Sequence, residues 1–129
     1  MRPLPLDLFA SLITGGLQVE ARGSSSLLRV DWSGRSTAPR PETILAPCFE
    51  EVLERARSQE CGIELHLEQL ESSNGSITEA VINFIHAARA QGTRVAVSFD
   101  AGQEWQSSSF EALRDFELPD GLVKIRALQ

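Results

Sequence analysis

The chain has 129 residues, of which 42% are hydrophobic and 23% charged, the composition of one globular domain and not of a disordered tail. Its formal net charge of −6 argues against nucleic acid and anionic membrane surfaces as partners, because both select clustered Lys and Arg. No run approaches the roughly 18 apolar residues of a membrane span, and the first residues lack a signal-peptide pattern. We therefore expect a cytoplasmic protein.

The first sixteen residues form a Pro-bounded apolar segment, which we predict to be an N-terminal extension (1–16) of a domain covering 17–129. The spacing of its apolar residues, followed by two glycines, predicts a short helix: Leu8, Phe9, Leu12, Ile13, Gly15, Gly16. This extension could cap the domain or dock a partner, and the pattern slightly favours capping.

Strict alternation of apolar and polar residues predicts five strands in the rest of the chain. The first two form a hairpin across Gly23 and three serines, and their apolar positions are Leu17, Val19, Ala21, Leu28, Val30 and Trp32. The later three have apolar positions at Ile63, Leu65, Leu67, Val95, Val97, Phe99, Val123 and Ile125. Trp32 ends its strand, and we expect it to be partly buried at the sheet edge.

Helical spacing predicts three helices between these strands. The first carries apolar residues from Ile44 to Ala56 and is expected to begin near Pro47, where a missing N–H costs nothing. The second begins at a capping box formed by Ser76 and Glu79 and ends at Gly92. The third is expected over about 105–115, with three side chains facing inward: Phe110, Leu113 and Phe116.

The order β, β, α, β, α, β, α, β predicts a single α/β domain. We expect a mixed, mostly parallel sheet with an N-terminal hairpin and helices packed on it. The two histidines, His66 and His86, and the two cysteines, Cys48 and Cys61, have no spacing that builds a triad or a metal site. The sequence therefore predicts no enzyme, no cofactor and no metal, with Cys48 in the core.

From about Leu27 onward this order resembles the STAS domain, the fold of bacterial anti-sigma-factor antagonists. Residues 27–38 resemble the second strand of that family and its Ser-Gly turn, and residues 63–99 resemble its strand, signature loop, helix and strand without a gap. The resemblance covers about three-quarters of the chain. It implies a regulatory module that binds a kinase-like anti-sigma factor or another signalling protein.

The family's signature loop has an apolar pair followed by Asp-Ser-Ser-Gly, and the positions that match it are Ser72, Ser73, Asn74, Gly75, Ser76 and Ile77. The family's phosphoacceptor therefore falls on Gly75, which has no hydroxyl. Ser76 is the remaining phosphorylation candidate, although a role as helix N-cap is favoured. The resemblance implies a partner-binding surface over Ser72, Ser73, Asn74, Gly75, Ser76 and Glu79, and self-association is a further expectation.

The sequence leaves three alternative functions open. The first is a non-catalytic regulatory module that resembles a partner-switching antagonist. The second is a STAS-like scaffold or assembly subunit that has lost phosphoregulation, which Gly75 favours. The third is a small-molecule site above the carboxyl ends of the strands, a usual ligand position in open α/β sheets, which no group of residues specifically supports.

Overall fold

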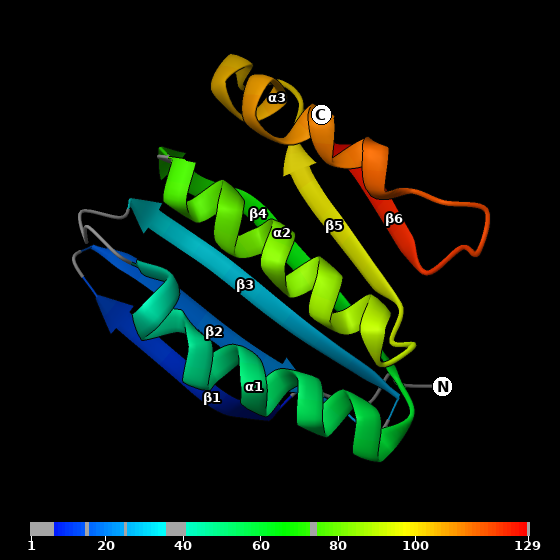
Figure 1. Cartoon of the computed structure of the whole chain (residues 1–129). Helices are drawn as coiled ribbons and strands as arrows, with labels where there is room; N and C mark the ends of the chain where they lie inside the picture. Colours follow the sequence, from blue (N-terminus) through cyan, green and yellow to red (C-terminus); the bar gives the residue numbers. More distant parts are fainter. Residues whose placement is uncertain (1–6, 15, 25, 36–40, 73–74, 129) are drawn as a thin grey trace, which may run out of the picture.

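A computed structural model describes residues 7–14, 16–24, 26–35, 41–72 and 75–128 (Figure 1). Among these residues six strands, three α-helices and one 3-10 helix follow one another in the order β1 Asp7–Thr14, β2 Leu17–Gly23, β3 Leu27–Arg35, α1 Pro41–Gln59, β4 Gly62–Ser72, α2 Gly75–Ala90, β5 Val95–Asp100, α3 Glu104–Phe110, the 3-10 helix η1 Glu111–Phe116, and β6 Val123–Leu128. The side chains of Ser72 and Ser76 lie outside the described part of these elements.

All six strands form one sheet in chain order, from β1 at one edge to β6 at the other. The pairs β1–β2 and β2–β3 are antiparallel, and the pairs β3–β4, β4–β5 and β5–β6 are parallel. The predicted α/β class is therefore confirmed, with its mixed, mostly parallel sheet and its N-terminal hairpin.

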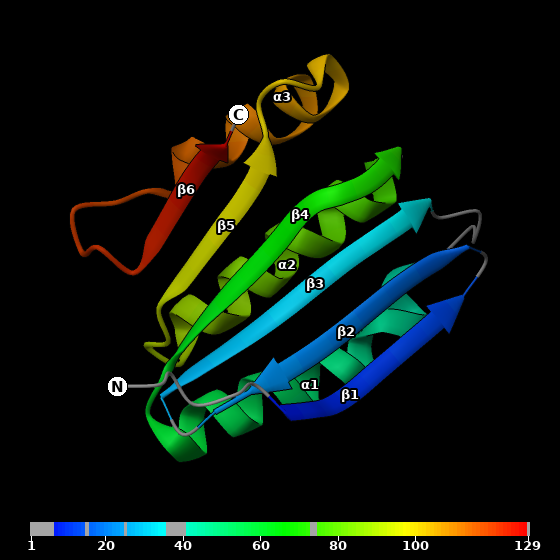
Figure 2. The same ribbon diagram turned by 180° about the vertical axis from the view of Figure 1, so that it is seen from behind.

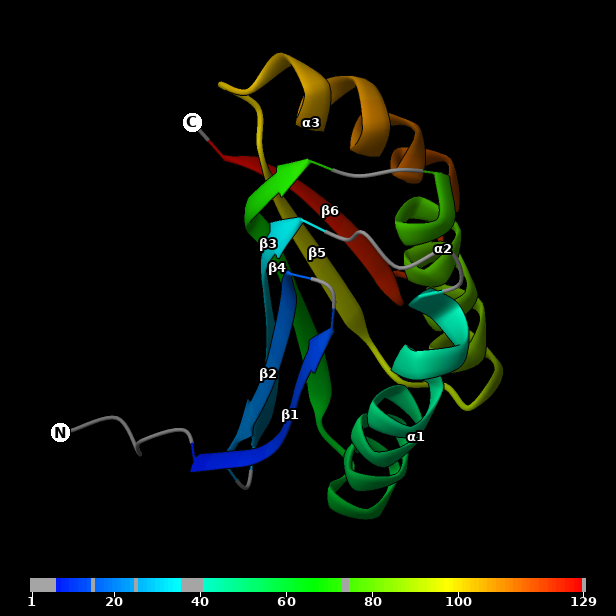
Figure 3. The same ribbon diagram turned by 90° about the vertical axis from the view of Figure 1, so that its left-hand side faces the viewer.

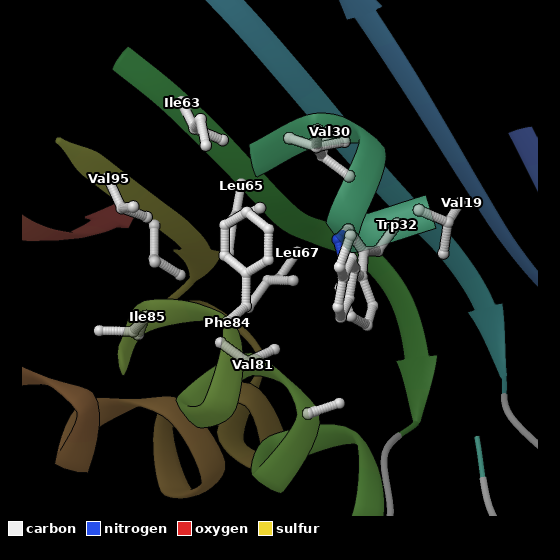
Figure 4. Close-up of a cluster of buried hydrophobic side chains, with 14 of the residues drawn as sticks. Val19, Val30, Trp32, Ile63, Leu65, Leu67, Val81, Phe84, Ile85 and Val95 are labelled. Atoms are coloured by element: carbon white, nitrogen blue, oxygen red, sulfur yellow. The ribbon is translucent and has the colours of Figure 1, made fainter. Parts of the chain in front are cut away.

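The helices α1 and α2 lie on one side of the sheet, and α3 lies across the ends of β4 and β5 (Figure 3). Figure 2 shows the other face, which we call the open face, with the strands in front of α1 and α2. The predicted apolar positions of β2 to β5 all point toward the helices and are buried there. Figure 4 shows part of this core, where side chains of β2 to β5 meet those of α2.

The predicted short helix over residues 8–13 is wrong, because these residues form the edge strand β1. Thr14 pairs with Leu17 across a two-residue turn, in which Gly16 has a φ of +91°. A positive φ favours glycine, and the pairing on either side shows that Gly16 lies at a hairpin and not at a helix end. A short apolar run fits either structure, and pairing with β2 decides the outcome.

The expected start of the first helix at Pro47 is also wrong, because α1 begins at Pro41 and Pro47 lies inside it. The turn before Pro47 carries Leu45, whose side chain is completely buried. Burial of a leucine stabilises a fold by about 2 kcal/mol, which offsets part of the cost of the hydrogen bond that proline removes. Tertiary packing therefore stabilises the helical residues that precede Pro47.

Two further predictions concern aromatic residues. The expectation that Trp32 is only partly buried is wrong: its side chain has no exposed surface, and its ring lies 5.4 Å from that of Phe49. The third helix is shorter than expected, since α3 ends at Phe110 and continues as η1. Its inward side chains are confirmed, with Phe110 and Leu113 buried and Phe116 packed against the core.

Candidate functional site

The candidate partner-binding residues lie where β4 leads into α2. Ser72 is the last residue of β4, and Gly75 and Ser76 are the first two residues of α2. Ser73 and Asn74 lie outside the described residues. The predicted strand and the helix that follows it are therefore confirmed, while the loop between them and the N-cap role of Ser76 stay predictions.

The first turns of α2 divide its side chains between the core and the surface. Ile77 and Ala80 face the sheet and are buried, whereas Glu79 is exposed. Because residues four apart share a helix face, Glu79 and the exposed Asn83 form one row on the outer side of α2. The start of α2 therefore presents a polar row to the surface, with Glu79 nearest its first turn.

A buried glutamine that the sequence analysis missed holds the end of β4. Gln106 of α3 has no exposed surface, and its amide nitrogen lies 3.1 Å from the carbonyl oxygens of Leu67, Glu68 and Leu70. Its side-chain oxygen accepts a hydrogen bond of 2.7 Å from the backbone N–H of Asp100. A single side chain thus joins α3 to the carboxyl ends of β4 and β5.

These bonds compensate for an irregularity in β4. The pairing of β3 with β4 shifts between Asp31–His66 and Ser33–Gln69, so β4 contains one extra residue at this point. A β-bulge leaves ladder groups unpaired, and buried carbonyls need partners. Gln106 supplies these hydrogen-bond partners. It therefore holds in place the last residues of β4, which lead to the candidate loop. The sequence carried one signal for this role: Gln106 lies four positions before Phe110, on the face of the predicted helix that points inward.

An apolar groove runs between α1 and α2, which lie side by side on the sheet (Figure 1). Its volume is about 340 Å³, and it is lined by Ala46, Phe49, Glu50, Leu53, Ala80, Asn83, Phe84 and Ala87. Phe49 and Phe84 meet edge to face in the core beneath it, with ring centroids 5.0 Å apart. The small alanine side chains on both helices leave the space above these rings open.

The rim of the groove is acidic and polar. Glu50 of α1 and Asn83 of α2 line it, and both are exposed. Glu79 continues the row of Asn83 toward the start of α2, next to the predicted binding loop. At the other end Gln91 donates a hydrogen bond of 2.9 Å to the carbonyl oxygen of Leu53, which ties the end of α2 to α1. The groove therefore lies beside Glu79, the member of the predicted surface whose side chain the structure describes.

The histidines lie apart from this region. His66 of β4 is on the open face, where its ring nitrogens lie 3.3 Å from Glu68 and 2.9 Å from Glu64. The hydrogen bond with Glu68 raises the pKa of His66, partial burial opposes this, and the bond with Glu64 adds to the increase. His86 of α2 packs edge to face on Phe116 at 5.2 Å. Within the described ranges, no group of three or more His, Cys, Asp or Glu side chains could hold a metal ion.

Neither cysteine is activated as a nucleophile. Cys48 is buried, as predicted, and burial raises the pKa of its thiol, with a further increase from Glu51. Burial also raises the pKa of the half-buried Cys61 thiol. A raised pKa lowers the thiolate fraction, and the thiolate is the reactive form. Both side chains therefore favour a structural role.

A second cavity, of about 610 Å³, lies at the amino ends of the parallel strands beside Ser26, Cys61, Gly62 and Arg94. Ligands in open α/β sheets bind at the carboxyl ends of the strands. This position therefore adds no support to the small-molecule alternative.

Comparison with family models finds no family that matches the chain, and comparison with curated proteins finds no matching relative. None of the helices in the described part of the chain is long and apolar enough to cross a membrane.

Proposed function

We propose that this chain is a non-catalytic regulatory module that binds a protein partner through the α1–α2 groove and the adjoining start of α2. The observation that carries the proposal is the apolar groove, with Glu50 and Glu79 exposed beside it. The resemblance to anti-sigma-factor antagonists supports the same class of function. A kinase-like anti-sigma factor or another signalling protein is the proposed partner.

The chemistry of the groove defines the segment that would bind it. Apolar side chains at the centre of an interface supply most of its binding energy, and a polar rim supplies specificity. The floor of Phe49, Leu53 and Phe84 fits one apolar anchor side chain. The acidic rim and the net charge of −6 select Lys or Arg beside that anchor. The proposed partner segment therefore presents a large apolar residue flanked by basic residues.

The alternative is a scaffold or assembly subunit without phosphoregulation. Gly75 favours it, because the position that matches the family's phosphoacceptor has no hydroxyl. Ser76, at the second position of α2, is the remaining candidate acceptor. Both functions use the same protein-binding surface and differ in whether phosphate regulates it. We also propose a cytoplasmic location, which the free thiols of Cys48 and Cys61 support.

The proposal is tested by placing a charge in the groove. Ala87→Arg puts a guanidinium at an exposed position that lines the groove. We expect this change to weaken partner binding by at least about tenfold, because it blocks the apolar pocket and desolvates a charge, at a cost of more than about 1.4 kcal/mol. Proteins retained by the parent chain are identified by affinity capture, and the purified partner is then titrated by calorimetry.

Ala90→Arg is the matched control, since Ala90 is exposed on the same helix and does not line the groove. The control should bind with the affinity of the parent chain. Equal affinity of the parent and Ala87→Arg would refute the groove as the binding site. Mass spectrometry after incubation with the partner and ATP separates the two functions: a phosphate that peptide mapping locates on Ser76 supports the switch, and an unchanged intact mass supports the scaffold.

A further inference from the structure

The two edge strands of the sheet, β1 and β6, differ in how they are protected from pairing with another strand. At the β6 edge, Ile125 donates its backbone N–H to Glu117 over 3.1 Å and accepts a hydrogen bond from Arg114 over 3.4 Å. Lys124 and Arg126 add exposed charges along this strand. Charged side chains and covered backbone groups are the usual protection of an edge strand against pairing with another chain. The β6 edge is therefore closed to a further strand.

The β1 edge has none of this protection. Its eight residues contain no Pro, Lys or Arg, and the single charge is that of Asp7 at its start. Among the described residues, no strand and no side-chain hydrogen bond occupies the outer edge of β1. Leu8 and Ile13 are exposed by 52% and 74%, although both are large and apolar. A long apolar edge whose one charge lies at its start is a template for strand addition.

The faces of β1 follow from its register with β2. Leu8, Ser11 and Ile13 pair with Arg22, Glu20 and Gln18. Directly opposed residues of an antiparallel pair point to the same face, so these three side chains lie on the open face. The opposite face carries three apolar side chains. Phe9 lies under the Arg55 guanidinium, 4.1 Å from ring centroid to charge, and Ala10 and Leu12 line a hollow beside α1.

The geometry points to a second copy of this chain as the occupant of this edge. We propose that two β1 strands pair antiparallel about a two-fold axis that passes between the two Ser11 residues. In this register Leu8 faces Ile13 of the second copy on the open face, and Ala10 faces Leu12 on the helix-covered face. Phe9 is the extra residue, as it already is in the pairing of β1 with β2, where the register shifts between Leu8 and Ala10.

Self-complementarity is the reason for choosing a second copy. A two-fold interface brings the same surface of both chains together, so each residue of the patch must suit its symmetry mate. Here the two exposed apolar residues of one strand cover those of the other, with two contacts between Leu8 and Ile13. The pairing joins two six-stranded sheets into one. This proposal concerns the sheet edge and is independent of the α1–α2 groove.

The first test measures the oligomeric state of the full chain by sedimentation equilibrium at protein concentrations from about 1 µM to 1 mM. This range detects dimers with dissociation constants between about 1 µM and 1 mM. The parent chain should form dimers within this range. Ile13→Lys places a charge opposite Leu8 of the second copy and should abolish the dimer. Leu118→Lys is the matched control, since Leu118 is 46% exposed and lies outside β1, and it should dimerise like the parent chain. Circular dichroism checks that both variants are folded.

The second test fixes the register. The two-fold axis places Ser11 opposite itself, at a Cα separation of about 4.5–5.5 Å, which a disulfide can span. Ser11→Cys should therefore cross-link under mild oxidation. Ile13→Cys is the control, because its symmetry mate lies several residues away along the strand. Paired groups reach millimolar effective concentrations, so a Ser11→Cys chain that is dimeric at roughly 10 µM should cross-link about 100-fold faster than Ile13→Cys; for a weaker dimer the comparison is made at the concentration where the parent chain dimerises.

The two tests also define what overturns the proposal. A parent chain that is monomeric over the whole concentration range excludes a second copy as the occupant of the edge. A dimer that persists in folded Ile13→Lys places the interface elsewhere. Equal cross-linking of the Ser11→Cys and Ile13→Cys variants refutes the two-fold register. None of these results bears on partner binding at the groove, which Ala87→Arg tests separately.

Discussion

The two faces of the central sheet are built from the same strands but differ in chemistry. On the helix-covered face, neighbouring strands place Val19, Val30 and Leu65 in the core, and none of these side chains has exposed surface. On the open face, apart from the edge strand β1, the strands carry mostly polar and charged side chains. The register aligns one of them from each of five strands in a row across the sheet: Glu20, Asp31, His66, Ser98 and Arg126.

Opposite charges pair on the open face, both along a strand and between strands. Arg22 lies 2.7 Å from Glu20 and 3.8 Å from Asp31, while Arg126 lies 4.0 Å from Glu64 on another strand. Partly exposed pairs of this kind contribute at most about 1 kcal/mol each. Stability therefore resides mainly on the covered face, where apolar area is removed from water, while the polar side chains of the open face remain in contact with solvent.

The largest expected effect comes from two adjacent residues of β4 on opposite faces. Leu65→Ala removes a fully buried side chain and should lower the free energy of unfolding by about 3 kcal/mol. Glu64→Ala removes the pairs with His66 and Arg126 and should cost no more than about 1 kcal/mol. Urea denaturation of both variants at pH 7 measures the difference.

A cost above about 2 kcal/mol for Glu64→Ala exceeds what partly exposed pairs contribute and would contradict the assignment of stability to the covered face. Glu64→Gln separates charge from packing, because it keeps the size of the side chain. If both Glu64 variants behave alike, the small effect belongs to the ion pairs.

An intermediate effect is expected from Gln106, the polar residue buried beside the apolar core. Gln106→Leu leaves three β4 carbonyls and the Asp100 N–H without their partner, and should destabilise the fold by about 2 kcal/mol. The Asp100 amide should also exchange its hydrogen faster. Denaturation and residue-resolved hydrogen exchange measure the two effects.

Ser108→Ala is the control for this change, since Ser108 is exposed on the same helix and should shift stability by less than about 0.5 kcal/mol. Unchanged protection of the Asp100 amide in Gln106→Leu would show that water replaces the glutamine. In that case the end of β4, and the loop that follows it, does not depend on α3.

The covered face is also the part of the fold that the sequence predicts well. Alternation places Ile63, Leu65 and Leu67 on one side of β4, and all three are buried, because one face of the sheet is covered and the other is not. The same reasoning fails for β1. Its apolar residues fit a helical as well as an extended pattern, and only pairing with β2 separates the two.

The candidate site shows the same division. The order of strand, loop and helix from Ser72 to Glu79 is local in sequence and was predicted, whereas the groove requires α1 and α2 to pack together. Gln106 was missed because its partner carbonyls are 36 to 39 residues away in the chain. No periodic pattern encodes such contacts, since they arise from how the ends of β4 and β5 meet α3.

The smallest effect sharpens the role of the open face through His66. Hydrogen bonds with Glu68 and Glu64 raise its pKa in the folded chain, while partial burial and Arg29 oppose the increase. A raised folded pKa stabilises the fold below the unfolded value of about 6.5, and this contribution is lost as pH rises through the folded value. His66→Gln keeps a polar side chain without the titration. The parent should therefore exceed the variant in stability by more at pH 6 than at pH 9, by up to about 1 kcal/mol.

Urea denaturation of both chains across this range gives the difference directly and cancels the titration of other groups. A difference that is independent of pH would mean that Glu68 and Glu64 do not raise the pKa of His66 in the folded chain.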